Sequence, residues 1–292
     1  MSLFNAFDSG KFAITAQMHL PKTADPEEVV RQAEMLTDYV DAVQLTDNPG
    51  AQVHMSGLAA AALLIPMGLD PVMHFNCRDR NRIALQGDLL GAIAIGVTSV
   101  LISRGREIPN AEKLRIKNVF DTPAKDLMAY ARKLRQEDSS FVNADFRVGA
   151  TSIIFDPERD WTPKSLSEKC DAGANFVQSQ LCFDIDILRN YMAHIVGAKL
   201  THRSKFMIAL SPLPSIEMAC WMRENIKGAV IPENILNRMY DAKDPEIEGM
   251  KICAELMAQA AEIPGIAGVN LLTLGSLNTI PETISISGLR NI

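Results

Sequence analysis

Short runs of β-branched and apolar residues alternate with longer segments of helical period along the chain. This alternation is typical of repeated strand–helix units that build a parallel sheet. The segment DPEEVVRQAEMLTDY predicts a helix with Asp25 as its N-cap and Pro26 in its first turn. The segment RIALQGDLLGAIAIG predicts another helix, which ends at Gly96. Eight strands are predicted, at 12–20, 40–46, 71–76, 98–103, 145–151, 175–180, 205–210 and 267–273.

Eight strand–helix repeats in 292 residues favour an α/β fold, a closed (β/α)8 TIM barrel, over an open doubly wound sheet. The open sheet is further disfavoured because no G-x-G-x-x-G joins a strand to a helix. No Gly/Ser-rich linker divides the chain, so we expect a single domain over 1–292. The longest interruptions are 104–123, after the fourth strand, and 229–243, beyond the seventh. The first belongs to the rim where barrel enzymes bind ligands.

The first predicted strand separates polar from apolar side chains. Ala13, Thr15, Gln17 and His19 share one face, and apolar residues share the other. Because the apolar face should meet the helices, the polar face points into the barrel. Gln17 and His19 then lie nearest the C-terminal mouth, where barrel enzymes keep their active sites. Two interpretations stay open, a pair of ligand-facing residues or a hydrogen-bonded polar plug in the upper barrel.

Other strands deliver polar residues to the same rim. The candidates are Thr46, Asp47, His74, Asn76, Ser103, Arg104, Gly105, Arg106, Thr151, Gln178 and Gln180. Each is a weak signal alone, but their convergence at one end is typical of a binding site. We predict no metal site, since the rim has no H-x-H pair and no cluster of carboxylates. Amides, hydroxyls, imidazole and guanidinium groups favour a polar heterocycle and an anion as ligands.

Composition narrows the possible partners. The formal net charge is −6, from 29 Lys+Arg and 35 Asp+Glu, and gives no basic stripe for a nucleic-acid backbone. No apolar stretch approaches the roughly 20 residues of a membrane span, and the first residues do not resemble a signal peptide. We therefore expect a cytoplasmic protein without nucleic-acid or membrane partners. Five scattered cysteines without C-x-x-C spacing indicate buried reduced thiols.

One long segment carries a family resemblance. HFNCRDRNRIALQGDLLGAIAIGVTSVLISRG resembles the strand–helix–strand core of methylenetetrahydrofolate reductases, which reads approximately H-x-T-C-R-D-R-N-x-x-x-L-Q-x-D-L-L-G-A-x-x-L-G. NVFDTPAKDLM, KCDAGANFVQSQLCFD and FMIALSPLPS match later family segments in the same order. The resemblance implies a (β/α)8 barrel that binds FAD at its C-terminal rim, where NAD(P)H and a tetrahydrofolate derivative use the same flavin face in turn. It also leads us to expect a homo-oligomer.

The resemblance implies roles for individual residues. Gln180 falls on the glutamine that hydrogen-bonds the folate pterin, and its amide offers a donor and an acceptor together. The charges of Arg104 and Lys169 suit a pyrophosphate. Lys169 as a solvated helix residue and Gln180 as an internal barrel amide are the alternatives. The implied FAD-binding residues are Thr46, His74, Arg104, Gly105, Ala150 and Lys169, with Phe120 and Asp121 near the adenosine end.

Several positions depart from the family pattern. Gln17 stands where F-E-F-x-P-P-[KR] carries the glutamate that acts as general acid, and glutamine cannot donate that proton. Arg106 replaces the aspartate of the family's R-G-D, and an inward-pointing arginine there would raise the flavin potential. TSIIFD replaces a Tyr and a His, Ile216 replaces an aromatic that can sandwich folate, and Ser276 replaces an Arg. These departures make weak or absent FAD binding an alternative.

His19 lies on the same strand face as Gln17, one pleat nearer the mouth, and histidines titrate near neutrality. We hypothesise that His19 supplies the missing proton; the alternative is a histidine bonded to a rim carbonyl. The sequence thus predicts a flavin-dependent oxidoreductase of one-carbon metabolism that interconverts 5,10-methylenetetrahydrofolate and 5-methyltetrahydrofolate. Two alternatives are a folate-binding or methyl-transfer partner protein without redox activity, and a flavin-free NAD(P)H–folate reductase.

Overall fold

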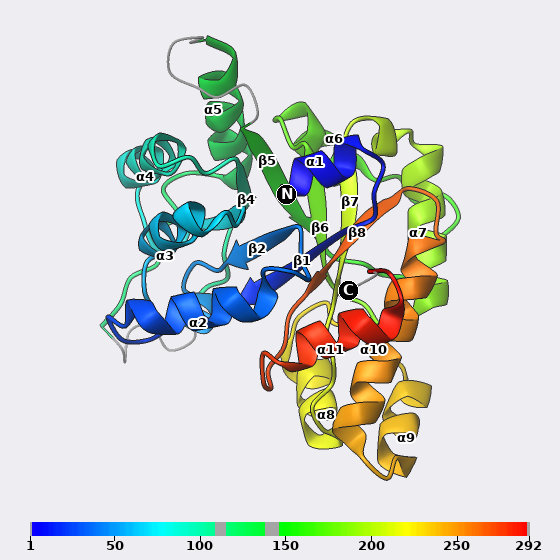
Figure 1. The fold of residues 1–292 in the computed structure, drawn as a ribbon. Helices are drawn as coiled ribbons and strands as arrows, with labels where there is room; N and C mark the ends of the chain where they lie inside the picture. The colour runs from blue at the N-terminus through cyan, green and yellow to red at the C-terminus, as the bar shows by residue number, and fades with distance from the viewer. Residues whose placement is uncertain (1, 109–114, 138–145, 291–292) are drawn as a thin grey trace.

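The eight strands form a closed parallel barrel in chain order, which confirms the predicted (β/α)8 fold (Figure 1). The structure is a computed structural model that describes residues 2–108, 115–137 and 146–290. The start of the predicted strand at 145, part of 104–123 and both ends of the predicted domain lie outside these residues. The strands are β1 (Ala13–Met18), β2 (Ala42–Leu45), β3 (Pro71–Asn76), β4 (Ser99–Ser103), β5 (Arg147–Ser152), β6 (Phe176–Leu181), β7 (Lys205–Leu210) and β8 (Ile266–Leu271).

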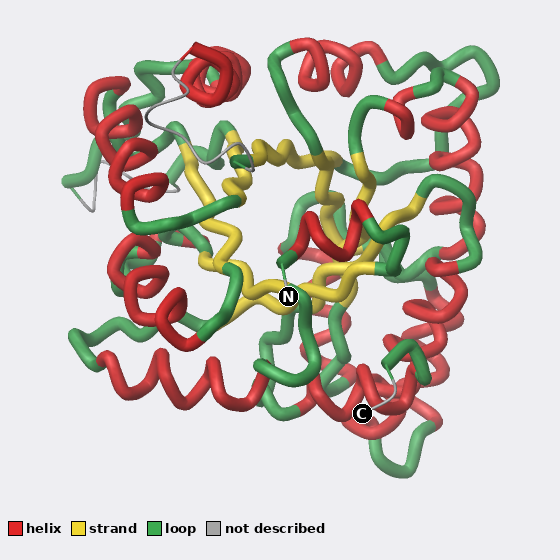
Figure 2. Tube along the Cα trace, turned by 45° about the horizontal axis from the view of Figure 1, so that its top comes forward, coloured by secondary structure: helices red, strands yellow, loops and turns green. Residues whose placement is uncertain are grey.

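Helices alternate with the strands and surround the barrel (Figure 2). Both predicted helices are confirmed, because the Asp25 side chain accepts from two backbone N–H groups of α2, and Gly96 follows α4 with φ 97°. The helices are α1 (Leu3–Asp8), α2 (Pro26–Leu36), α3 (Gly57–Leu64), α4 (Arg82–Ala94), α5 (Ala124–Glu137), α6 (Lys164–Asp171), α7 (Ile185–Gly197), α8 (Ile216–Asn225), α9 (Glu233–Asp241), α10 (Pro245–Ala261) and α11 (Thr279–Ser287). The short 3-10 helices are η1 (Pro49–Ala51), η2 (Ile65–Met67) and η3 (Leu200–His202).

Helix α1 lies across the end of the barrel where the strands begin (Figure 2). Leu3 and Phe7 pack against inward side chains that include Val72 and Phe176. The backbone N–H of Leu3 donates to the Asp70 carboxylate at 2.8 Å. The sequence pattern did not indicate this helix. Because it covers the N-terminal end, the opposite end, which we call the mouth, is the one left for a ligand.

Inward side chains stack in levels along the barrel axis. The strand pairings are staggered, so alternate strands contribute inward residues at the same height. The other face of β1, with Ile14 and Ala16, packs in the core against the helices, which confirms the faces predicted for this strand. Three polar levels approach the mouth in this order: Gln44 with Gln178 and Asn270, Gln17 with His74 and Thr151, and Thr46 with Ser103 and Gln180.

Candidate functional site

The structure brings several predicted residues together at the mouth. Gln17, His74 and Thr151 share one level, and Thr46 and Gln180 lie on the next level outward. Gln17 and Gln180 are half-buried, and neither side-chain amide hydrogen-bonds to the part of the chain that the structure describes. Two amides are therefore available to a ligand from strands β1 and β6.

A hydrogen-bonded layer lies directly beneath these amides. Gln44, which is fully buried, donates from Nε2 to Gln178 Oε1 at 2.5 Å and to Thr15 Oγ1 at 3.1 Å. Thr15 Oγ1 in turn donates to Asn270 Oδ1 at 2.9 Å. The predicted polar plug therefore exists, but it holds Thr15 and Gln178 and not Gln17. Gln44 and Asn270 escaped the sequence analysis, although both are polar residues within apolar strands.

His74 forms the upper edge of this layer. Its Nε2 donates to Gln44 Oε1 at 2.7 Å. Burial lowers the pKa of His74 from 6.5 to about 4. The imidazole is therefore neutral at pH 7, and it can recognise a ligand through hydrogen bonds but not through a positive charge.

His19 is exposed at the rim, and its Nε2 donates to the Thr273 carbonyl at 2.7 Å. Its backbone N–H donates to Gln32 Oε1 at 2.8 Å, and Gln32 Nε2 donates back to its carbonyl at 2.7 Å. The rim-carbonyl bond anticipated as the alternative is thus present. It occupies one ring nitrogen and leaves the other for a ligand.

The loop after β4 presents a cation. The Arg104 guanidinium lies 4.3 Å from the centroid of the Phe120 ring, and its Nη2 is 3.6 Å from Glu107 Oε1. Asp121 accepts from the backbone N–H of Arg82 at 2.8 Å and so caps the start of α4. Arg104 and Phe120 are therefore in contact, whereas the Asp121 carboxylate binds the first residue of helix α4.

Arg106 is exposed, and its Nη2 donates to the Lys227 carbonyl at 3.0 Å. Lys227 precedes a stretch in which Val230 pairs with Cys182 beyond the end of β6. The arginine thus ties the β4 loop to the chain segment between α8 and α9. Because solvent screens an exposed charge, the expected increase in flavin potential from Arg106 would be small.

Lys169 reaches the end of β5 from helix α6. Its Nζ donates to the Thr151 carbonyl at 2.7 Å. Burial and the nearby charge of Lys125 lower the pKa of Lys169. The half-buried ammonium is therefore anchored at the mouth and is not a freely solvated helix residue.

Two predicted site positions, Ala150 and Ile216, and one departure from the family pattern, Ser276, lie as follows. Ala150 is fully buried in the core between β5 and the helices, so its side chain does not reach the rim. Ile216 is half-buried at the first residue of α8. Ser276 is exposed after β8, and its carbonyl accepts from the Thr279 backbone N–H at 3.2 Å and hydroxyl at 2.8 Å.

The rim beside β2 and β3 is held by ionic and amide contacts. The Asn76 backbone N–H donates to Asp47 Oδ2 at 2.7 Å, and Arg80 pairs with the same carboxylate. Burial raises the pKa of Asp47, while Arg80 opposes that shift. Gly105 has φ 80°, and a Cβ there would lie 2.9 Å from Arg78 Cβ, so glycine permits the loops to meet. Asp47 and Asn76 therefore maintain the shape of the rim.

Thr46 is held by a histidine. Its Oγ1 lies 3.3 Å from His54 Nε2, which also accepts from the Asn48 backbone N–H at 3.1 Å. His54 Nδ1 donates to the Met55 carbonyl at 2.7 Å. These contacts fix the threonine hydroxyl at the edge of the mouth.

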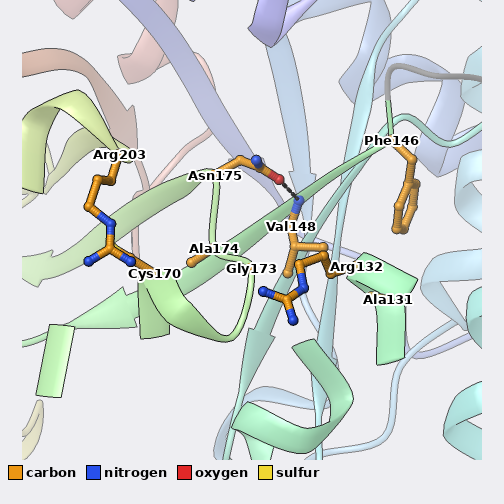
Figure 3. Close-up of a pocket in the computed structure, with 9 residues that line it drawn as sticks. All are labelled: Ala131, Arg132, Phe146, Val148, Cys170, Gly173, Ala174, Asn175 and Arg203. Carbon is orange, nitrogen blue, oxygen red and sulfur yellow. Dashed lines mark hydrogen bonds between the residues drawn. The ribbon is translucent and has the colours of Figure 1, made fainter. Parts of the chain in front are cut away.

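Two hollows lie outside the mouth. A cavity of about 140 Å³ between α5, β5 and α6 is lined by Arg132, Cys170 and Arg203 among others (Figure 3). Both arginines already donate to Asp171, at 2.7 and 2.5 Å. A second hollow of about 480 Å³ lies beside α2 and α3 and includes Lys22 in its lining. Neither contains a residue that the sequence analysis assigned to catalysis, cofactor or substrate.

Among the residues that the structure describes, no three His, Cys, Asp or Glu side chains gather in a way that could hold a metal ion. Within the same ranges, no helix combines the length and apolar character needed to cross a membrane.

The structure defines a TIM-barrel protein with a cluster of polar side chains at its mouth. The chain belongs to the methylenetetrahydrofolate reductase family, whose model matches residues 3–288. It is 24% identical over 242 residues to the probable methylenetetrahydrofolate reductase (NADPH) of Caenorhabditis elegans, covering 82% of this chain and 35% of that protein. It is 22% identical over 253 residues to methylenetetrahydrofolate reductase 2 of Saccharomyces cerevisiae, covering 82% of this chain and 40% of that protein. The chain thus matches less than half of either relative's length.

Solved structures agree on the fold. A Clostridium thermocellum protein that binds two copies of 5-methyl-5,6,7,8-tetrahydrofolic acid superposes with a TM-score of 0.66 at 14% identity, covering 98% of this chain and 97% of that one. The long-chain alkane monooxygenase LadA superposes with a TM-score of 0.61 at 12% identity, covering 95% of this chain and 90% of that chain. At such identities the likeness establishes the barrel alone.

The low pKa of His74 makes stability depend on pH. Because the folded pKa of about 4 lies below the ordinary 6.5, the unfolded chain binds more protons between these values. The free energy of unfolding should therefore fall as pH decreases through this window, by up to roughly 1.4 kcal/mol per pH unit. Urea unfolding at pH 7 and pH 5 should show a smaller loss for His74→Gln than for the wild type. His202→Gln, at an exposed position, should match the wild type. An equal loss of unfolding free energy in His74→Gln and in the wild type would contradict the low pKa of His74.

Proposed function

We propose that this chain binds a tetrahydrofolate derivative at the mouth and interconverts its 5,10-methylene and 5-methyl forms on a bound flavin. The observation that carries the proposal is the pair of half-buried amides of Gln17 and Gln180, which lie above a hydrogen-bonded polar layer and have no hydrogen-bond partner among the described residues. A pterin edge presents donors and acceptors side by side, and a carboxamide complements both. The ligand of the Clostridium thermocellum neighbour supports the same class of substrate.

The residues at the ends of β4 and β5 fit an anionic dinucleotide. Arg104 exposes its guanidinium beside the Phe120 ring, and Lys169 holds its ammonium at the end of β5. These two cations would neutralise a pyrophosphate, while Thr46 and neutral His74 would orient a heterocycle. FAD bound there would supply hydride transfer, with NAD(P)H as the electron donor.

The proton required for the reaction needs a source other than Gln17, because a carboxamide does not act as a general acid. We retain His19 as the proposed donor. Its Nε2 is engaged by the Thr273 carbonyl, but a protonated imidazole carries a hydrogen on each nitrogen. The second hydrogen would then be available to the substrate, directly or through water.

A second candidate function is a folate-binding or methyl-transfer partner protein without redox activity. It is favoured by the uncharged Gln17 at the position of the family's acid and by Arg106, which is tied to the Lys227 carbonyl. Both functions require folate at the mouth, and only the first requires electron transfer. A flavin-free reductase would bind folate and oxidise NAD(P)H without any flavin.

Folate binding is tested at Gln180. Gln180→Leu removes a donor and an acceptor while keeping similar volume, so the Kd for 5-methyltetrahydrofolate should rise about tenfold, as two net hydrogen bonds imply. Isothermal titration calorimetry measures this change. Gln52→Leu is the control, since Gln52 is an exposed rim glutamine bonded to Lys22. An unchanged Kd in Gln180→Leu would place the folate elsewhere.

The source of the proton is tested at Gln17. Gln17→Glu restores a carboxylic acid and should raise the rate of 5,10-methylenetetrahydrofolate reduction by about a hundredfold, the low end of the contribution of a general acid. His19→Ala should slow the wild type but have little effect in the Gln17→Glu background. Gln52→Glu controls for added charge at the rim. If His19→Ala leaves the wild-type rate unchanged, His19 is not the donor.

A further inference from the structure

Gln44 joins side chains from three other strands of the barrel. It contacts Thr15 on β1 and His74 on β3, and it reaches across the barrel to Gln178 on β6. All three distances lie between 2.5 and 3.1 Å, and Gln44 has no exposed surface. Both hydrogens of its amide and one lone pair of its oxygen are used.

The direction of these bonds follows from Thr15. Its hydroxyl hydrogen goes to Asn270 Oδ1 at 2.9 Å, so its oxygen accepts from Gln44 Nε2. The Gln44 amide nitrogen therefore faces Thr15 and Gln178, and its oxygen faces His74. Because an amide oxygen only accepts, the hydrogen of the neutral imidazole must be on Nε2. His74 Nδ1 is then an acceptor, and it makes no hydrogen bond within the described residues.

The layer is not built for stability alone. Asn270 Nδ2 is buried without a hydrogen-bond partner among the described residues. A buried unsatisfied donor costs about 1–3 kcal/mol, and apolar side chains of similar size would avoid that cost. The arrangement is consistent with a layer that serves to orient the groups above it, of which His74 is one.

We propose that Gln44 is a positioning residue that holds His74 in its Nε2–H tautomer, so that Nδ1 accepts a hydrogen from an N–H of the bound heterocycle. His74 shares its level with Gln17, which places the imidazole among the residues of the mouth. Since His74 is neutral at pH 7, the tautomer and not the charge determines what the ring recognises. The ligand part of this inference rests on the proposed function; the tautomer part does not.

Nuclear magnetic resonance of the ligand-free protein tests the tautomer. The chain has five histidines, so long-range 1H–15N spectra of 15N-histidine-labelled protein are tractable, and His74→Gln identifies the His74 signals. The wild type should give the Nε2–H pattern. Gln44→Met, which fills similar space without hydrogen bonding, should give a mixture of tautomers and raise the Kd for 5-methyltetrahydrofolate about tenfold.

Gln178→Met is the matched control, because Gln178 contacts Gln44 and has no bond to His74. It should leave the Nε2–H pattern intact even if it lowers the unfolding free energy. An Nδ1–H pattern in the wild type, or an unchanged pattern in Gln44→Met, would overturn the proposal.

Gln44→Glu covers the case in which Gln44→Met fails to fold. A carboxylate facing His74 should convert the ring to an imidazolium at neutral pH, with both nitrogens protonated. A neutral ring in Gln44→Glu would mean that Gln44 does not control His74. If the wild type binds no 5-methyltetrahydrofolate, the proposed function fails while the tautomer result still stands on its own.

Discussion

The hydrogen bonds of Gln44 are the constraint on which the mouth depends. A closed barrel gives its inward polar side chains little water, so they must satisfy one another or a ligand. Gln44 binds Thr15 and Gln178 across the barrel, and it also binds His74 on the next level toward the mouth. That layer forms the floor of the site. Because Gln44 gives both hydrogens of its amide to Thr15 and Gln178, it does not engage the amides of Gln17 and Gln180 above it.

The rim divides into two parts with different tasks. Beside β2 and β3, Asp47 is engaged by Asn76 and Arg80, so its charge maintains the loops. Beside β4 and β5, the rim presents two cations: Arg104, whose exposed guanidinium has Glu107 at 3.6 Å, and Lys169, whose ammonium donates to the Thr151 carbonyl. The proposed anionic ligand would therefore meet the side of the mouth beside β4 and β5. Gln17 and Arg106 stand at the two positions where the family pattern has acidic residues, so neither position supplies a carboxylate to the mouth.

The barrel was predictable because alternating βα patterns are local, and the faces of β1 follow from a period of two. The hydrogen-bonded layer around Gln44 was not predictable, because Gln44 and Gln178 are 134 positions apart in the sequence and meet only through the stagger of the strands. Helix α1 is too short to give a clear period. Family resemblance assigned Ala150 to the cofactor, yet its side chain faces the helices. Likewise, the Arg106 bond to Lys227 depends on a segment 121 residues away.

Membership in the methylenetetrahydrofolate reductase family leads us to expect flavin chemistry. The replacement of the family's two acidic residues by Gln17 and Arg106 argues against that expectation. The most direct test is an absorption spectrum from about 300 to 550 nm, the range of flavin bands, recorded without oxygen before and after adding 5-methyltetrahydrofolate. The proposed function predicts a flavin band that bleaches on addition of the folate, because the cations of the rim would retain FAD and the amides would hold the substrate. A protein that takes up no flavin even after incubation with FAD would contradict it.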